Sequence, residues 1–322
     1  MAADRRKRPS DFLASKAEKG DARSCPFCPG NEDKTPPAVV AYTAEGVVEG
    51  EAAREARDWQ IRVIPNLYAA MVPQPAPPTL QWVALPGHGS HEVIIDSPDH
   101  WTSAAEFSVE RLDLLLSVYR DRYSYYCGMN DVRYIAIFKN RGEAAGASLA
   151  HTHSQVVALP IIPPLIKREV EASSEASFCL YCNVIEREAA SERLISRNDS
   201  WILIAPFYSQ APYETWILPR AHISNLDEMT EAQRMDLARM IKDALMRNSS
   251  LLNDPPFNLE IFQMPYDYHM NIRIQPAISK TAGFERGTGV YLNPVPPEQA
   301  AAELRLMQKT EKLNNQQHLK PL

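Results

Sequence analysis

The sequence predicts a fold that combines strands and helices and repeats its plan once along the chain. Two observations predict it. Short apolar runs typical of strands alternate with longer helical patterns, and the same motifs return in the same order in the second half of the 322-residue chain. Because chance would not preserve that order, an internal duplication of roughly 150 residues is the economical explanation.

In the first half, the expected helix begins at Ser108, a good N-cap residue. Its apolar positions follow at spacings of three and four residues, which predicts one buried stripe: Leu112, Leu115, Leu116, Tyr119 and Tyr123. The expected strands of this half cover residues 59–64, 91–96, 132–138 and the run from His151 into the apolar stretch 156–160.

The second half is expected to repeat these elements. Thr230 and Gln233 form a capping-box pattern at the start of its helix. His222 precedes Thr230 by eight residues, as His100 precedes Ser108 by eight. The expected strands cover residues 201–205, 215–218, 258–264 and 268–273.

Composition excludes several classes of function. A formal charge of −6 argues against a broad nucleic-acid-binding face, because such a face needs clustered cations. The apolar run 156–166 is interrupted by prolines and too short to span a bilayer, and the N-terminus lacks the apolar core of a secretory signal. We therefore expect a cytoplasmic protein that binds neither membranes nor nucleic acid. The basic residues up to about residue 24 are expected to form a solvated arm.

The stretch from Asn140 to Gln155 carries the most chemistry. In a strand, His151, His153 and Gln155 would share one face, because side chains alternate with a period of two. Glycines at 142 and 146 let the preceding loop bring backbone N–H groups close to an anion. This pattern predicts a phosphate beside an imidazole, although a His-x-His pair alone is more often a surface or metal-ligand pair.

Each half also supplies two cysteines and two histidines. Such Cys2His2 sets suit tetrahedral Zn²⁺, and four protein ligands leave no position for a reactive water, so both sites are expected to be structural. The alternative is that one set binds another metal or none. The sets are Cys25, Cys28, His100 and His151 in the first half, and Cys179, Cys182, His222 and His269 in the second.

If His151 binds zinc, His153 remains free two residues later. A neutral imidazole is a good nucleophile towards phosphorus, and its attack on the α-phosphate of a sugar nucleotide would give a nucleotidyl-histidine and a sugar phosphate. Gln155 could hold a non-bridging oxygen of that phosphate. In the second half, His269 and Asn271 stand where His151 and His153 stand in the first, so only the first half keeps the second histidine.

Several motifs together resemble the galactose-1-phosphate uridylyltransferase family of the histidine-triad superfamily. They are Arg5-x-Lys-Arg8-Pro9, Cys25-Pro-Phe-Cys28, Ser97-Pro-Asp-His100, Phe138-Lys-Asn140-x-Gly142, Gly146-Ala-Ser148-x-x-His151-Thr-His153-Ser-Gln155 and Ala282-Gly-Phe-Glu285. As an ordered set spread over nearly the whole chain, these motifs are specific, whereas each alone would not be.

The resemblance implies an α+β, histidine-triad-like fold of two duplicated halves, each with a mostly antiparallel sheet and helices. The expected halves are a catalytic one, 1–170, and a degenerate, zinc-stabilised one, 171–322, in a chain that forms homodimers. It also implies that His153 is nucleotidylated and that Gln155 contacts the transferred phosphate. The implied substrate contacts are Asn140, Gly146 and Ser148 near the phosphates, Arg5 and Arg8 around the second phosphate, Asn66 near the ribose, and Glu285 at the hexose hydroxyls.

The leading hypothesis is therefore a ping-pong hexose-1-phosphate (galactose-1-phosphate) uridylyltransferase that uses a UDP-sugar. The chain departs from the uridylyl pattern in reading His151-Thr-His153-Ser-Gln155 and Asn66-Leu-Tyr68. These variants and the second Cys2His2 set are similar to the ADP-glucose phosphorylase branch, which passes an adenylyl group to inorganic phosphate. That branch is the alternative, ahead of a nucleotide hydrolase or a zinc-stabilised binding protein without chemistry.

Overall fold

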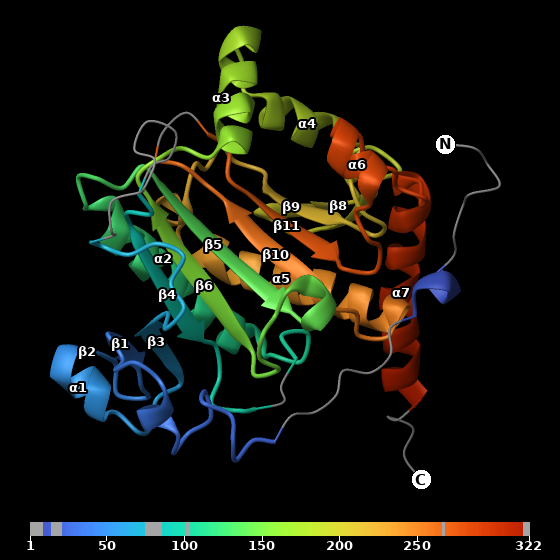
Figure 1. Ribbon diagram of the computed structural model, residues 1–322. Coiled ribbons are helices and arrows are strands. Elements are labelled where there is room, and N and C mark those ends of the chain that lie inside the picture. The colour runs from blue at the N-terminus through green and yellow to red at the C-terminus, as the bar shows by residue number, and fades with distance from the viewer. Residues whose placement is uncertain (1–8, 14–20, 75–85, 101–102, 266–267, 318–322) are drawn as a thin grey trace.

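A single antiparallel sheet organises the computed structural model, which describes residues 9–13, 21–74, 86–100, 103–265 and 268–317 (Figure 1). Its 11 strands follow the order β2-β1-β3-β4-β6-β5-β10-β11-β9-β8-β7. The strands are β1 (Val40–Tyr42), β2 (Val47–Glu49), β3 (Ile61–Pro65), β4 (Ser90–Ile95), β5 (Tyr134–Arg141), β6 (His153–Leu159), β7 (Leu194–Arg197), β8 (Trp201–Ile204), β9 (Thr215–Pro219), β10 (Phe257–Phe262) and β11 (Asn271–Pro276).

The strand order shows the repeat. Inside the edge strand β2, the run β1-β3-β4-β6-β5 on one side corresponds to β7-β8-β9-β11-β10 on the other, and the two runs meet where β5 pairs with β10. The α+β fold expected from the sequence is confirmed. The boundary expected at residue 170 lies inside helix α3 (Pro164–Ala176).

Two long helices cover one face of this sheet and bury the main core. In α2 (Val109–Cys127), the Ser108 hydroxyl accepts a hydrogen bond from the Arg111 amide, and α5 (Glu231–Leu252) begins with the expected capping box of Thr230 and Gln233. The apolar stripe of α2 is buried as its spacing predicts. A further helix, α7 (Pro297–Gln317), packs against α5 and β7.

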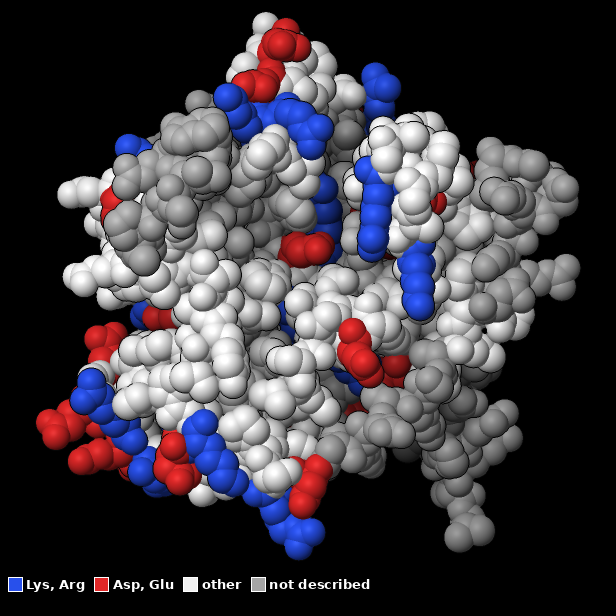
Figure 2. All heavy atoms as spheres, viewed as in Figure 1, with Lys and Arg blue, Asp and Glu red and all other residues white. Residues whose placement is uncertain are grey.

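In the part of the chain that the structure describes, helices cover the opposite face at its two ends. At one end, Phe27, Trp59 and Val93 belong to a small core beside α1 (Gly50–Glu55). At the other, α3 and α4 (Leu180–Glu188) pack over β8 and β9 through residues such as Ile166 and Tyr181. In the same view, Figure 2 shows charged side chains gathered near α1 and α3, with few in the middle of the face.

Some elements were not expected from the sequence. They are β1, β2, β7, α1, α3, α4, α6 (Gly283–Thr288) and α7. The prediction of a solvated arm up to about residue 24 is wrong for part of this segment. Phe12 is buried, and its ring centroid lies 6.1 Å from that of Tyr213. Burial of so large an apolar side chain outweighs the polar character of its neighbours. Among the described residues, no helix combines the length and apolarity needed to cross a bilayer.

Candidate active site

Strand β6 carries His153 and Gln155 on the open face of the sheet. Alternation along the strand sends Ser154 the other way, where its hydroxyl lies 2.6 Å from the Tyr119 hydroxyl of α2. His151 and His153 were expected to share one face, and their contacts with Phe27 agree with this. The Phe27 ring meets both imidazoles edge-on, with its centroid 6.1 Å from that of His151 and 5.3 Å from that of His153. The two histidines therefore flank one aromatic ring.

The imidazole of His153 is held in one orientation. Its Nδ1 lies 2.9 Å from the His151 carbonyl oxygen, and a carbonyl can only accept, so Nδ1 carries the proton. Burial lowers the pKa of His153, with the nearby Lys139 ammonium acting in the same direction, so the ring is neutral at pH 7. Nε2 accepts no hydrogen bond from any described residue, which leaves its lone pair available on the open face.

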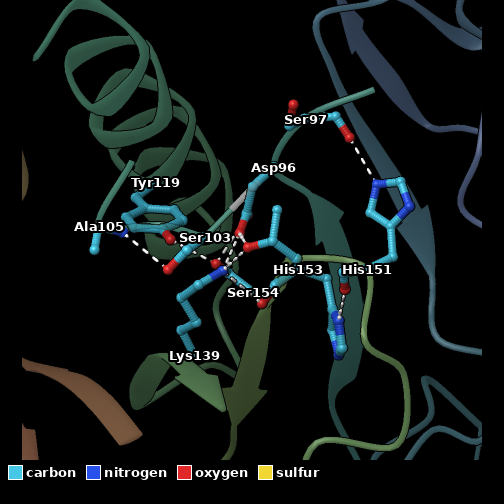
Figure 3. A network of polar contacts seen from close by, with 10 residues as sticks. Asp96, Ser97, Ser103, Ala105, Tyr119, Lys139, His151, His153 and Ser154 are labelled. Atoms are coloured by element: carbon cyan, nitrogen blue, oxygen red, sulfur yellow. Dashed lines mark hydrogen bonds and ion pairs between the residues drawn. The ribbon is translucent and has the colours of Figure 1, made fainter. Parts of the chain in front are cut away.

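A buried ion pair supports this segment from behind (Figure 3). The Lys139 ammonium pairs with the Asp96 carboxylate and donates to the Thr152 hydroxyl at 2.6 Å and the His153 carbonyl at 3.1 Å. Asp96 also accepts from the Ser154 hydroxyl at 2.9 Å. The backbone on both sides of His153 is thus tied to one charge pair that water does not reach.

The loop before β6 is shaped by glycine. Gly142 has φ +82°, and a Cβ there would lie 2.7 Å from Cβ of Pro256, so only glycine fits. The loop continues through a short 3₁₀ turn to Gly146, which has φ +87°, and to the exposed Ser148. Below the loop, the side-chain oxygen of Asn140 accepts a hydrogen bond from the side-chain NH2 of Asn258 at 2.9 Å.

The first Cys2His2 set lies beside this segment and is almost entirely buried. The ligand atoms of each set lie within 4.8 Å of one another. Nδ1 of His151 is 3.6 Å from Sγ of both Cys25 and Cys28, which matches the S···N edge of roughly 3.5 Å in a zinc tetrahedron. Nε2 of His151 donates to the Ser97 carbonyl at 2.8 Å, a partner that orients the ring for metal binding.

The second set has the same geometry but is more exposed. Nδ1 of His269 lies 3.6 and 3.5 Å from Sγ of Cys179 and Cys182, while its Nε2 donates to the Pro219 carbonyl at 3.1 Å. Cys182 and His222 are exposed. In both sets, burial and the neighbouring thiol raise the pKa of one cysteine, Cys28 to about 12 and Cys182 to about 11, so a bound cation is what would hold the thiolates. Two sets of residues that could hold a metal ion are therefore present.

The remaining expected residues are only partly brought together. Asn66 lies beside the site, 3.0 Å from His91 Nε2, whereas Arg5 and Arg8 lie outside the described residues. Glu285 caps its own helix by accepting from the Ala282 amide, and Figure 1 shows α6 near the top of α7, away from the His153 end of β6. Within this chain, Glu285 does not meet His153.

Other polar residues of the site were not anticipated. His91 lies 2.8 Å from Gln155, and Asn258 and Glu260 arrive on the same face through the pairing of β10 with β5. Lys139 and Asp96 are charged positions inside apolar strand patterns, a signal that the sequence does contain. Asn258 and Glu260 gave no such signal, because their position depends on a strand pairing between the two halves.

The chain is similar to proteins of one enzyme group. Residues 4–163 match the family described as "Galactose-1-phosphate uridyl transferase, N-terminal domain", and residues 88–321 match a domain of unknown function, DUF4921. An ADP-glucose phosphorylase from Arabidopsis thaliana is 32% identical over 94% of this chain and 87% of its own length. A galactose-1-phosphate uridylyltransferase from Thermotoga maritima is 30% identical over 67% of this chain and 74% of its own.

Solved structures show the same likeness. The crystal structure of an ADP-glucose phosphorylase from Arabidopsis thaliana with bound ADP-glucose superposes with a TM-score of 0.75 at 31% identity, covering 88% of this chain and 90% of that one. Both kinds of enzyme expected from the sequence are thus among the relatives.

Proposed function

Because this chain belongs to the galactose-1-phosphate uridylyltransferase family of nucleotidyltransferases, we propose that it moves a nucleoside monophosphate through a covalent adduct on His153. The observation that carries this proposal is the state of that imidazole. Its Nδ1 donates to the His151 carbonyl, which leaves Nε2 unprotonated, and the register of β6 puts the side chain on the same face of the sheet as Gln155.

The reaction then takes two displacements. Nε2 of His153 attacks the α-phosphorus of a nucleoside diphosphate hexose, the bond from that phosphorus to the bridging oxygen breaks, and hexose 1-phosphate leaves with the electron pair. A phosphate oxygen of the acceptor next attacks the same phosphorus and frees the imidazole. Gln155, with Asn140, Gly146 and Ser148, would hold phosphate oxygens, and Arg5 and Arg8 would neutralise the second phosphate.

We propose ADP-glucose as the donor and inorganic phosphate as the acceptor. Support comes from the similarity to the Arabidopsis thaliana ADP-glucose phosphorylase, which extends over 94% of this chain. A second candidate is uridylyl transfer between a UDP-sugar and galactose 1-phosphate, favoured by the match of residues 4–163 and by the Thermotoga maritima relative. Asn66 would contact the ribose in either case.

The metal sets would be structural zinc sites. In the first, Cys25, Cys28, His100 and His151 would hold the ion, which would fix the backbone two residues before His153 without touching the substrate. We further propose a cytoplasmic homodimer whose halves are residues 1–170 and 171–322. Since Glu285 lies away from His153 in its own chain, it would serve the hexose of the partner subunit's site.

The covalent step can be tested directly. The protein is incubated with ADP-glucose or UDP-glucose labelled at the α-phosphate, denatured in alkali and counted. Label should remain on the wild type and be lost on acidification, because protonation of the phosphoramidate nitrogen makes it a better leaving group. His153→Ala should take no label while keeping its metal. His88→Ala, which changes a partly exposed histidine paired with Asp131, should label normally.

Donor and acceptor are read from the same experiment. The nucleotide that leaves label on His153 identifies the base. Breakdown of ADP-glucose that needs added phosphate supports the phosphorylase reaction, and label discharged only by galactose 1-phosphate supports the uridylyltransferase. Turnover in water alone would reject both transferase reactions, and an unlabelled wild type would reject the covalent adduct.

A further inference from the structure

His91 lies on β4, one strand away from the proposed nucleophile, and its side chain is on the same open face. The pairing of β4 with β6 sets Val93 opposite Gln155 and His91 opposite Val157, so His91 is the diagonal neighbour of Gln155. Its Nε2 lies 2.8 Å from the side-chain carbonyl oxygen of Gln155. Burial lowers the pKa of His91, which keeps this imidazole neutral.

The backbone decides which nitrogen of His91 carries the proton. The Ala70 amide donates to Nδ1 at 3.1 Å, so Nδ1 must accept and Nε2 must hold the hydrogen. The NH2 group of Asn66 also lies 3.0 Å from Nε2, because the side-chain oxygen of Asn66 accepts from the Tyr68 amide at 2.8 Å. An NH2 group cannot accept, so this contact is not a hydrogen bond once Nε2 holds the hydrogen. The acceptor left for the Nε2 hydrogen is the oxygen of Gln155.

This hydrogen bond fixes the direction of the Gln155 amide. Because Nε2 of His91 is a donor, the oxygen of Gln155 must face it, whichever way the two ends of the amide are first assigned. The NH2 group then points away, and it donates to no described residue. A phosphate oxygen can accept from this group, whereas a reversed amide would present its own oxygen to the phosphate and repel it.

We propose that His91 is a positioning residue for nucleotidyl transfer, which holds the Gln155 carboxamide so that its NH2 group donates to the transferred phosphate. This rests on the proposed function, since it assigns Gln155 to that phosphate. The role differs from that of a merely structural histidine in one respect: it is exerted entirely through Gln155. A substitution of His91 should therefore matter only while Gln155 is present.

Two substitutions separate the contacts of His91. Asparagine reaches about as far as Nδ1, so His91→Asn can still accept from the Ala70 amide but cannot reach Gln155. Glutamine reaches about as far as Nε2, so His91→Gln can still donate to Gln155. We expect His91→Asn to slow formation of the His153 adduct by about tenfold to a hundredfold, and His91→Gln to restore most of that rate.

The decisive measurement is a double-mutant cycle on the single-turnover rate of adduct formation with α-labelled ADP-glucose or UDP-glucose. His91→Asn should lower the rate in the wild-type background and leave it unchanged in a Gln155→Ala background. His88→Asn, at a partly exposed histidine three residues before His91, is the matched control and should change neither rate.

Equal losses in both backgrounds, or no loss in either, would overturn the positioning role while leaving the covalent mechanism intact. Failure of the wild type to form any adduct would instead reject the proposed function and this inference with it. Nitrogen shifts of ¹⁵N-histidine report the tautomer independently of activity. We expect a protonated Nε2 and an unprotonated Nδ1 for His91, and the opposite tautomer would reject the proposal.

Discussion

Asn271 holds in the second half the position that His153 holds in the first, and each directs a side-chain nitrogen to the carbonyl two residues earlier. His153 Nδ1 lies 2.9 Å from the His151 oxygen, and Asn271 Nδ2 lies 3.3 Å from the His269 oxygen. The duplication has thus kept the local geometry and lost the imidazole. What remains at Asn271 is a closed polar cluster, because Arg273 donates to its side-chain oxygen at 2.8 Å.

We predict that Asn271→His does not create a second nucleophilic site. Arg273 pairs with Glu169 at 2.7 Å and lies over the rings of Trp216 and Phe262, so the space beside position 271 is filled by a cation that already has its partner. The measurement is α-phosphate labelling of Asn271→His combined with His153→Ala. Label on this double variant would show that the second half still binds a nucleotide.

The two metal sets should release their ions at different rates. Cys182 and His222 of the second set are exposed, whereas three of the four ligands of the first set are buried. A chelator should therefore remove one equivalent of metal quickly, and this loss should leave adduct formation unchanged. The second equivalent should leave slowly, and adduct formation should be lost at the same rate. Metal content and labelling are followed over the same time course.

The variants Cys182→Ser and Cys28→Ser assign these phases. The first should abolish only fast release, and the second should abolish labelling, because His151 and the segment leading to His153 lose their anchor. Simultaneous release of both ions would contradict the proposed difference between the sets.

The sequence predicted those parts of the structure that repeat or follow local rules. Both metal sets, the capping box of Thr230 and the β6 segment could be recognised because each depends on residue types at short or repeated spacings. Short strands such as β1 and β2, with three residues each, carry too little pattern to be recognised.

The rest of the site depends on which strands become neighbours. Asn258 reaches Asn140 across 118 residues of chain, and His91 reaches Gln155 across 64, because β10 pairs with β5 and β4 with β6. A shift of one residue in either pairing would turn these side chains to the opposite face. No local pattern fixes those registers, so these contacts could not be predicted from sequence.

The buried ion pair behind His153 gives a prediction on stability. Lys139→Met would leave the Asp96 carboxylate without its partner in a place that water does not reach, at a cost of about 3–5 kcal/mol in the free energy of unfolding. Urea unfolding of the metal-loaded wild type and variant measures this difference in the free energy of unfolding.

Removing both charges, in Lys139→Met with Asp96→Leu, should recover most of this loss, because no charge is then left uncompensated. Arg239→Met is the control, since it breaks a surface pair with Asp236 and should cost at most about 1 kcal/mol. If Lys139→Met were as mild as Arg239→Met, the pair would not be the anchor that its contacts indicate.

Glu260 gives a prediction on pH. It lies across β5 from Gln155, since both residues are paired with Phe138. Burial raises the pKa of Glu260 from 4.5 to about 7; the Arg273 cation acts to lower this pKa, and the Glu214 carboxylate acts to raise it. The folded protein therefore binds a proton at Glu260 more tightly than the unfolded chain does. Between pH 4.5 and 7 this group makes the free energy of unfolding fall as pH rises, by about 3 kcal/mol in all.

Glu260→Gln should remove that fall, because the amide does not ionise. The variant should match the wild type near pH 4.5 and exceed it at pH 8, in urea unfolding of the two proteins at each pH. Glu175→Gln, at an exposed position of α3, removes the same charge from the surface and should show no such divergence. Since the carboxylate lowers stability where the enzyme is expected to work, a variant that stayed parallel to the wild type across this range would mean that Glu260 is better solvated than its neighbours on the sheet indicate.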